Sequence, residues 1–381
     1  MDCSVKLAWW RPFAVLAVLS IVAAACGGDG DGGEPTGGGA TGETAATTGT
    51  TGETQLGGTL VISNWDLYMP ENLIPDFEAA TGVEVELALH TTNEDIMGKI
   101  TAQDGEGFDL VFVSGPFVSA LVAQGWAAEL DHSKIPNLAN LYPEATQLAY
   151  DPGNVHSAPY AWGTTGICYR TDLVSEIPTS WETFRNPPAE LDGKMTMLGT
   201  DRWLLQPALL SLGYSINTTD PAEIDAAVAW TEEAKGHLLG FDDTTFYSKL
   251  VSGDALAVQA WDGWCEYGRA EEPKIDFVIP DEGSDVWTDT MVILEASQNK
   301  DAAHAFIDFV LEATSGKAVS EFVLYKVPND PAMGSVDPDV IEGFPTLAIT
   351  PTQLFEQEAE TDLGADGIAL WTEAVTRIKA G

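Results

Sequence analysis

The amino-acid sequence predicts an α/β fold of doubly wound parallel sheets. Strand-like apolar runs alternate with amphipathic, helix-like segments along the chain, as they do in βαβ units. One run, FDLVFVS at residues 108–114, is almost continuously apolar, which is typical of a strand buried on both faces. The chain has 381 residues, of which 45% are hydrophobic, and this predicts two domains of ordinary size after a leader and a linker.

Residues 1–25 have the pattern of a signal peptide. Lys6 and Arg11 precede an apolar run that is shorter than the ~20 residues a spanning helix needs. Small residues stand directly before Cys26, as in the lipobox of bacterial lipoproteins, so we expect the mature chain to begin at a lipidated Cys26. A plain secretory signal with an incidental cysteine is the alternative. Residues 26–56, rich in Gly, Thr and Glu, predict a flexible linker.

The folded body is expected to open with a strand at residues 59–63. A helix that ends just before Gly82 follows, because Pro near the first turn and Gly at the stop are its usual punctuation. The loop between them contains Trp65, Asp66 and Tyr68. Ligands of open α/β sheets bind beyond the carboxyl ends of the strands, so this loop predicts one wall of a binding site.

Strand and helix patterns continue to alternate after this opening unit. Further strands are expected at residues 83–90, 108–114, 156–170, 195–198, 255–261, 274–280 and 287–294. Helices are expected from residue 92, at 118–124, from residue 201, at 222–235, up to residue 254, at 302–313 and at 365–379. The long extended segment 156–170 has Gly163, Thr164 and Thr165 at its middle, and such small residues suit a crossover between two domains.

The chain is strongly acidic, with a formal charge of −42 from 59 acidic and 17 basic residues. This balance argues against nucleic acid and anionic membrane surfaces as ligands, because both need Lys and Arg to neutralise phosphates. Two interpretations remain. The acidic surface keeps the protein soluble, or it raises the local concentration of a cationic ligand.

Cys168 and Cys265 are the two cysteines of the mature body. An exported protein meets oxidising conditions, so a disulfide between them is expected, and two buried free thiols are the alternative.

Signatures of catalysis are missing from the sequence. The five histidines are scattered, and neither a metal-ligand spacing, a phosphate-binding GxxxxGK[ST] loop nor a GxSxG elbow is found. The sequence therefore predicts a protein that is not an enzyme and uses no metal or cofactor.

Several predicted strand ends instead bring a tryptophan beside a carboxylate. The three clearest cases are Trp65 with Asp66, Trp261 with Asp262, and Trp287 with Asp289. Aromatic rings can enclose an organic cation, each contributing about 0.5–2 kcal/mol, and a buried carboxylate would pair with its ammonium group. Sugar stacking is the competing use of the same aromatic walls.

Six motifs together resemble one known family, the polyamine (spermidine/putrescine)-binding proteins of bacterial ABC transporters. The motifs are NWDLYMP at residues 64–70, DLVFVS at 109–114, PYAWG at 159–163, LGYSINTTDP at 212–221, WTD at 287–289 and a slightly displaced Tyr-Pro-Asn loop at 325–329. The resemblance extends from about residue 57 to the C-terminus.

The resemblance implies a two-lobed type II periplasmic-binding-protein fold whose lobes are joined by crossover hinge strands. The expected lobes are residues 57–163 plus 289–330, and residues 164–288 plus 331–381. It further implies an exported, monomeric solute-binding lipoprotein of the cell envelope that closes on a polyamine and delivers it to a membrane permease. Another small solute, such as a quaternary amine, an amino acid or a sugar, is the alternative ligand.

The expected ligand-binding residues come from both lobes and from the crossovers. They are Trp65, Asp66, Tyr68, Ser114, Trp203, Trp261, Trp287, Asp289, Tyr325 and Glu360. Among them the resemblance implies that Asp289 binds an amine of the ligand.

The sequence departs from the family pattern at three places, one of which is that Pro116 and Phe117 stand where tyrosines are expected after Ser114. Polyamine binders of the family have two carboxylates three residues apart before the LGYS motif, where this chain has Thr200 and Trp203. A C-terminal amide contact of the family falls on Glu358 or Glu360. These departures favour a shorter or differently shaped cation than spermidine, or a compensating carboxylate such as Asp66 or Glu360.

Overall fold

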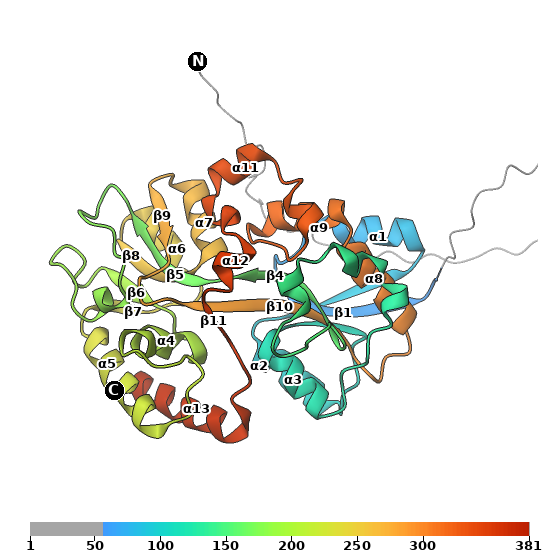
Figure 1. The fold of residues 1–381 in the computed structure, drawn as a ribbon, viewed down its shortest axis with the longest axis horizontal. Helices are drawn as coiled ribbons and strands as arrows, with labels where there is room; N and C mark the ends of the chain where they lie inside the picture. Colours follow the sequence, from blue (N-terminus) through green and yellow to red (C-terminus); the bar gives the residue numbers. More distant parts are fainter. Residues whose placement is uncertain (1–55, 381) are drawn as a thin grey trace, which may run out of the picture. The chain divides into compact units, whose positions relative to one another are not determined.

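Two β-sheets, each covered by helices, make up the part of the chain that the structure describes (Figure 1). The structure is a computed structural model, and it describes residues 56–380. The predicted signal peptide, the predicted lipidation site Cys26 and residues 27–55 of the predicted linker lie outside the described residues. The two sheets, with helices on both, correspond to the two-lobed α/β fold expected from the sequence.

The first sheet has the strand order β11-β10-β3-β1-β2, and β4 pairs with β10. Its strands are β1 (Thr59–Trp65), β2 (Glu84–His90), β3 (Leu110–Ser114), β4 (Ser157–Gly163), β10 (Asp285–Ile293) and β11 (Glu358–Ala359). Strands β1, β2 and β3 are parallel, whereas β10 is antiparallel to both β3 and β4.

The second sheet has the order β7-β6-β8-β5-β9. Its strands are β5 (Thr165–Arg170), β6 (Met195–Met197), β7 (Leu238–Phe241), β8 (Ala257–Trp261) and β9 (Ile275–Val278). Strand β5 is antiparallel to β8 and β9, while β6 is parallel to its neighbours. Within the expected doubly wound α/β fold both sheets are therefore mixed, because β5 and β10, the strands beside the crossovers between the lobes, run antiparallel to their neighbours.

Helices cover both sheets. They are α1 (Leu73–Thr81), α2 (Asn93–Ala102), α3 (Gly115–Ala123), α4 (Asp201–Ser211), α5 (Pro221–Lys235), α6 (Phe246–Ser252), α7 (Asp262–Glu271), α8 (Lys300–Val310), α9 (Ala313–Val323), α10 (Asp330–Met333), α11 (Pro338–Gly343), α12 (Pro351–Leu354) and α13 (Gly364–Ala380). Local signals explain several ends. Thr92 and Asp220 accept backbone hydrogen bonds as N-caps of α2 and α5, and Gly82 ends α1 with a left-handed φ of 72°.

Each lobe has its own hydrophobic core. Phe77, Phe112 and Phe306 lie in the core of the first lobe, whereas Trp181 and Trp230 lie in that of the second. These side chains are almost completely buried. Two separate cores are what a hinge needs, because each lobe can then stay intact when the other moves.

The chain passes between the two lobes at residues that differ from the predicted ones. One crossing lies earlier in the sequence than predicted and the other lies later. The predicted boundary between residues 288 and 289 falls inside β10, which belongs to the first sheet from Asp285 onward. The predicted return at residue 331 is also too early, because Ala332 and Leu354 still lie in the first core. Helix α13, which packs on α4 and α5, is the part of the C-terminal segment that belongs to the second lobe. The sequence did not indicate this later crossing, because α10, α11 and α12 are short helices with a proline in the first turn and no clear apolar period.

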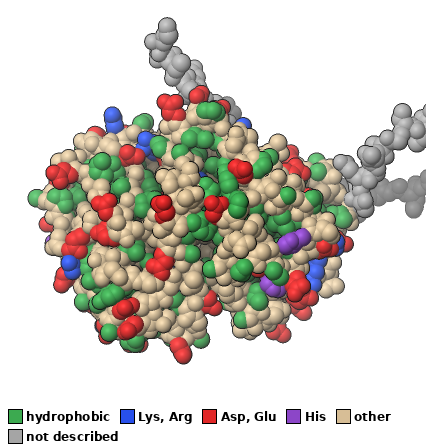
Figure 2. Space-filling view, viewed as in Figure 1, with side chains coloured by type: hydrophobic (Ala, Val, Ile, Leu, Met, Phe, Trp, Pro, Cys, Tyr) green, Lys and Arg blue, Asp and Glu red, His purple; other side chains and the backbone are tan. Residues whose placement is uncertain are grey.

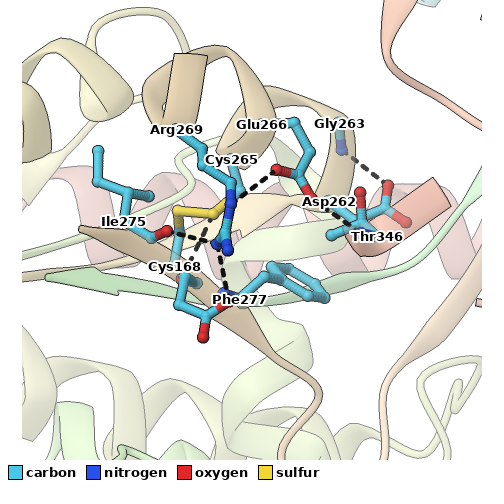
Figure 3. The surroundings of a disulfide bond; sticks show 10 residues. Cys168, Asp262, Gly263, Cys265, Glu266, Arg269, Ile275, Phe277 and Thr346 are labelled. Atoms are coloured by element: carbon cyan, nitrogen blue, oxygen red, sulfur yellow. Dashed lines mark hydrogen bonds and ion pairs between the residues drawn. A yellow bond between two sulfur atoms is a disulfide. The ribbon is translucent and has the colours of Figure 1, made fainter. Parts of the chain in front are cut away.

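A disulfide ties α7 to the second sheet (Figure 3). It joins Cys168 on β5 to Cys265 on α7, which are 97 residues apart in the sequence. Beside it Arg269 donates to the backbone oxygen of Ile275 at 2.6 Å and to Asp276 at 3.0 Å. The bridge and these bonds fix α7 at the end of β8, where Trp261 stands.

Acidic side chains are spread over the whole face of the described residues that Figure 2 shows, and they do not gather in one patch. None of the helices within residues 56–380 has the length and apolar character that a membrane crossing requires.

We predict that the double variant Cys168→Ala/Cys265→Ala unfolds more easily. The bridge closes a loop of about a hundred residues, and its loss should lower the free energy of unfolding by about 2–5 kcal/mol, measured by urea titration. Reduction of the wild-type protein should give the same loss, while the double variant should not respond to reductant. Two free thiols in the mass spectrum of unreduced protein would contradict the bridge.

Candidate functional site

The loop after β1 presents its side chains in two directions. Leu67 has a left-handed φ of 54°, which a leucine rarely adopts, and its side chain is 73% exposed. Beside it Asp66 is exposed and forms no hydrogen bond or ion pair with another described residue. Tyr68 turns inward, and its backbone oxygen accepts a 2.5 Å hydrogen bond from the hydroxyl of Tyr160. The structure therefore separates Asp66 from the inward-facing residues of its own motif.

Asp289 lies at the centre of the inward-facing residues. Its Oδ1 accepts a hydrogen bond from the Ser114 hydroxyl at 2.6 Å, and its Oδ2 accepts one from the Tyr68 hydroxyl at 2.7 Å. Asn93 in turn donates to the Ser114 oxygen at 3.0 Å, so the Ser114 proton is directed at Asp289. The register of β10 against β4 shifts between Asp289 and Thr290, as it does at a β-bulge. Three strand ends therefore converge on one carboxylate.

The surroundings of Asp289 are poor in positive charge. Burial raises the pKa of its carboxyl group, and the hydrogen bonds from Ser114 and Tyr68 oppose this shift. Burial and the nearby Asp289 charge raise the pKa of Tyr68 well above its usual range, so the phenol stays a donor. Within residues 56–380 no Lys, Arg or His forms an ion pair with Asp289. A carboxylate has about four acceptor sites, so positions for another donor remain.

Four predicted aromatic residues form a continuous chain of edge-to-face contacts. The ring centroids of Trp65 and Tyr68 are 5.5 Å apart, those of Tyr68 and Tyr325 6.3 Å, and those of Tyr325 and Trp287 4.9 Å. His90, at the end of β2, packs on the outer side of Trp65 at 4.6 Å. These contacts bring Trp65, Tyr68, Tyr325 and Trp287 together in one group.

Close packing at the crossover holds Trp287 in place. A Cβ atom on Gly163 would lie 2.3 Å from the Trp287 ring and 2.5 Å from Asp262, so only glycine fits there. Asp262 is completely buried and forms an ion pair with the buried Lys326, which links α7 to the segment that follows α9. Glycine is needed again at position 263, where a Cβ would lie 2.5 Å from the Tyr325 ring.

Trp203 and Trp261 contact each other on the second lobe, with centroids 5.1 Å apart. Both are only partly buried. The indole nitrogen of Trp203 donates to Asp285 at 2.9 Å, and the backbone nitrogen of Thr165 donates to the same carboxylate at 2.8 Å. Trp261 packs against the cores of both lobes. This pair therefore lies at the junction of the lobes, next to the crossover strands.

A hollow opens between the first lobe and the crossover segments. Its wall on the first lobe includes Gly115, Pro116 and Tyr150. Trp287 and Glu360 line its other side. Glu358 is the other position on which the C-terminal contact of the family could fall. Its carboxylate does not line the hollow, because it accepts hydrogen bonds from Asn217 at 3.0 Å and from the backbone nitrogen of Ile216 at 3.0 Å.

The structure thus brings most of the predicted site residues into one region and leaves Asp66 outside it. It also adds residues that the sequence did not indicate, namely His90, Asn93, Tyr150, Tyr160 and Asp285. Four of them contact a predicted residue that is distant in sequence, and Tyr150 lines the hollow with Trp287, so no local pattern reveals them. Among residues 56–380 no cluster of three or more His, Cys, Asp or Glu side chains is arranged to hold a metal ion.

Comparison with known proteins gives consistent matches. The sequence model of the family described as bacterial extracellular solute-binding protein matches residues 72–341. The spermidine/putrescine-binding periplasmic protein of Escherichia coli is 31% identical over 324 residues, covering 85% of this chain and 92% of the relative. A putative spermidine/putrescine ABC transporter structure from Listeria monocytogenes is 30% identical, with a TM-score of 0.77 and coverage of 84% of this chain and 98% of its own. A lipoprotein structure from Treponema pallidum is 27% identical, with a TM-score of 0.75 and coverage of 84% and 99%.

We predict an acid-sensitive step in stability that originates at His90. Burial, with the charge of Lys99, lowers the pKa of this ring from 6.5 to about 4, so the folded protein keeps it neutral while the unfolded chain binds a proton. The contribution of the neutral ring to the free energy of unfolding, roughly 3 kcal/mol, is fully present above pH 6.5. It is lost as the pH falls from 6.5 through 4. Urea unfolding at several pH values should show this slope in the wild-type protein and lose it in His90→Asn. The exposed His132→Asn is the control, and an unchanged slope in His90→Asn would contradict the assignment.

Proposed function

The chain belongs to the bacterial extracellular solute-binding proteins, and we propose that it captures a polyamine, a putrescine- or spermidine-like cation, for an ABC importer. The relatives are named as binding proteins of transport systems, and this chain belongs with them as a binding protein. In this proposal the ligand is held and released unchanged, without any reaction at the site.

The observation that carries the proposal is the environment of Asp289. A carboxylate in a mostly desolvated site is costly unless a cation joins it, and the described residues bring none. Tyr68, Trp287 and Tyr325 surround this position with aromatic faces and edges, and such rings attract an organic cation by about 0.5–2 kcal/mol each. A ligand ammonium on Asp289 would satisfy the charge and the rings together.

The ligand class follows from charge and from the named relatives. The relative from Escherichia coli is named for spermidine and putrescine, and both of these are flexible chains with several ammonium groups. A neutral sugar would leave Asp289 without a counter-charge, so the sugar interpretation of the aromatic wall has less support. A quaternary amine or an amino acid in the same fold remains the second candidate, since either would also bring a cation to Asp289.

Capture is proposed to occur by closure of the two lobes. Tyr68, Ser114 and Asp289 come from the first lobe, whereas Trp203 and Trp261 come from the second lobe. A ligand that touches both groups at once would bind the closed arrangement better than the open one and shift the population toward it. The closed form of the monomer would then be the form that a membrane permease recognises.

The family is extracellular, and the chain is accordingly an exported protein of the cell envelope. We further propose that it is anchored by lipid on Cys26. The small residues before this cysteine support the anchor, and a structural neighbour from Treponema pallidum is itself named a lipoprotein. The acidic linker that follows would let the binding body reach the permease.

We predict that Asp289→Asn weakens the binding of 1,4-diaminobutane by tenfold or more. The change replaces a charge-assisted hydrogen bond by a neutral one, and the difference appears in the calorimetric Kd at fixed ionic strength. Trp287→Ala should weaken binding to a similar degree, because it removes an aromatic wall.

Asp66→Asn is the matched control, since it removes the same charge from an exposed carboxylate nearby and should change Kd less than threefold. Equal affinity in Asp289→Asn and the wild-type protein would remove Asp289 from the site. A thermal-shift panel in which an amino acid or a sugar stabilises the protein and no polyamine does would overturn the proposed ligand class.

A further inference from the structure

Asp262 and Lys326 form an ion pair in the interior of the protein. The ammonium group of Lys326 donates to the Asp262 carboxylate, and the two residues are only 2% and 0% exposed. Taking two charges out of water is costly, and an apolar pair of similar volume is often at least as stable. A buried ion pair is therefore weak evidence for a role in stability alone, and its place in the fold indicates what else it does.

Each partner directly follows an aromatic residue of the candidate site. Asp262 follows Trp261 of the second lobe, and Lys326 follows Tyr325, which lies in the core of the first lobe. Trp261 with Asp262 is one of the strand ends whose pattern predicts a place for an organic cation. The structure shows that Lys326, a residue of the chain itself, brings the ammonium group to this carboxylate. The pairing of Asp262 therefore serves the arrangement of the chain.

The ion pair encloses the crossover between β4 and β5. The backbone nitrogen of Asp262 donates to the Thr164 oxygen at 3.1 Å, and the backbone oxygen of Lys326 accepts from the Trp162 nitrogen at 3.1 Å. Gly163 stands between these two bonds, and a Cβ atom there would lie 2.5 Å from the Asp262 carboxylate. The crossover is therefore held by the second lobe on one side and by the first lobe on the other.

The same crossover supports the aromatic residues around Asp289. The Trp287 ring would lie 2.3 Å from a Cβ atom on Gly163, and the Tyr325 ring 2.5 Å from one on Gly263. The two rings contact each other with their centroids 4.9 Å apart. Both rings are thus packed against residues that neighbour or contact the ion pair, so a shift of the pair would move one ring against the other.

Further bonds extend the ion pair to the segment that follows α11. Figure 3 shows Thr346 of this segment next to Asp262 and Glu266 of α7. The Thr346 backbone oxygen accepts from the Lys326 ammonium at 3.3 Å, and its backbone nitrogen donates to Glu266 at 2.8 Å. Because the disulfide fixes α7 to β5, these contacts join the second sheet to the first lobe beside the crossover.

We propose that Asp262 and Lys326 are positioning residues of the ligand site. Their ion pair holds Tyr325 and Trp287 in the arrangement that receives the ligand, so affinity depends on the pair separately from the stability of the fold. This inference rests on the proposed function and goes beyond it by assigning a binding role to two residues that do not touch the ligand. Rings that are already ordered bind more tightly, because the ligand does not have to order them.

The experiment compares stability with binding in the double variant Asp262→Asn/Lys326→Met. Both replacements nearly keep the side-chain volume, and removal of the whole pair should leave the thermal midpoint within about 3 °C of the wild-type value. The Kd for 1,4-diaminobutane, measured by calorimetry on the full chain, should nevertheless rise about tenfold. The near-ultraviolet circular dichroism of the ligand-free variant should weaken, because Tyr325 and Trp287 become less ordered.

The single variant Asp262→Asn tests the same point with one isosteric change. It leaves the Lys326 ammonium buried and unpaired, so its thermal midpoint should fall by about 5–10 °C. Well below that midpoint, where the variant is folded, its Kd should show the same rise of about tenfold.

An ion pair far from the crossover provides the matched control. Arg170, at the opposite end of β5 from the crossover, is 7% exposed and donates to Asp172 at 2.9 Å. Arg170→Met/Asp172→Asn should lower the thermal midpoint, because the backbone oxygen of Leu250 also loses its bond to Arg170. It should keep Kd within about twofold of the wild-type value, since it lies outside the site.

The outcomes separate this inference from the proposed function. If the double variant is as stable as the wild-type protein and binds 1,4-diaminobutane with unchanged Kd, the pair is only structural. An unchanged Kd in folded Asp262→Asn overturns the inference equally, even where the double variant does not fold. If the wild-type protein binds no amine, the proposed function itself falls. The near-ultraviolet spectra of the ligand-free proteins then still decide the point, because identical spectra in the wild-type protein and the variants would show that the pair does not order the rings.

Discussion

A partly buried carboxylate that lacks a counter-charge is the constraint on which the rest of the site depends. Asp289 sits where the ends of β1 and β3 meet β10, and it uses one oxygen for Ser114 and the other for Tyr68. These two neutral donors reduce the cost of burial without removing it. The site is therefore arranged around a negative charge whose counter-charge would come from a bound ligand. The aromatic residues around Asp289 favour an organic cation as that ligand.

Bonds at the junction between the lobes fix the positions of the site residues next to the crossover strands. Asp285 accepts hydrogen bonds from β5 and α4. The Asp262–Lys326 ion pair connects α7 to the segment that follows α9, and the disulfide joins α7 to β5. Breaking such a buried pair by removing one partner is costly, of the order of 3–5 kcal/mol, because the other charge stays buried. These bonds hold Trp287 and Trp261 beside the crossover, where Trp287 is paired with Gly163 and Trp261 with Thr165.

Much of the fold could be predicted because its signals are local. The first strand, the helix that ends at Gly82 and the strand after it were all expected within about two residues of where they lie. The direction of β10 was not predictable, because it depends on pairing with β3 and β4 across more than a hundred residues of sequence. The lobe boundaries failed for the same reason.

The site shows the same division between local and distant information. The aromatic and acidic motifs at strand ends, with the family resemblance, identified the residues that contact one another around Asp289. Asp66 is exposed beside the left-handed Leu67, a conformation that the sequence does not signal at a leucine, so its separation from the inward-facing residues could not be predicted. The hydroxyl of Tyr160 reaches the Tyr68 backbone across 92 residues, a contact that is visible only in three dimensions.

The most direct test of this account is a crystal structure of the protein grown with 1,4-diaminobutane. It should show one ammonium nitrogen at about 3 Å from Asp289, with Trp287 and Tyr68 beside the methylene chain and both lobes in contact with the ligand. A diamine bound elsewhere, with Asp289 still bonded only to Ser114 and Tyr68, would contradict the account.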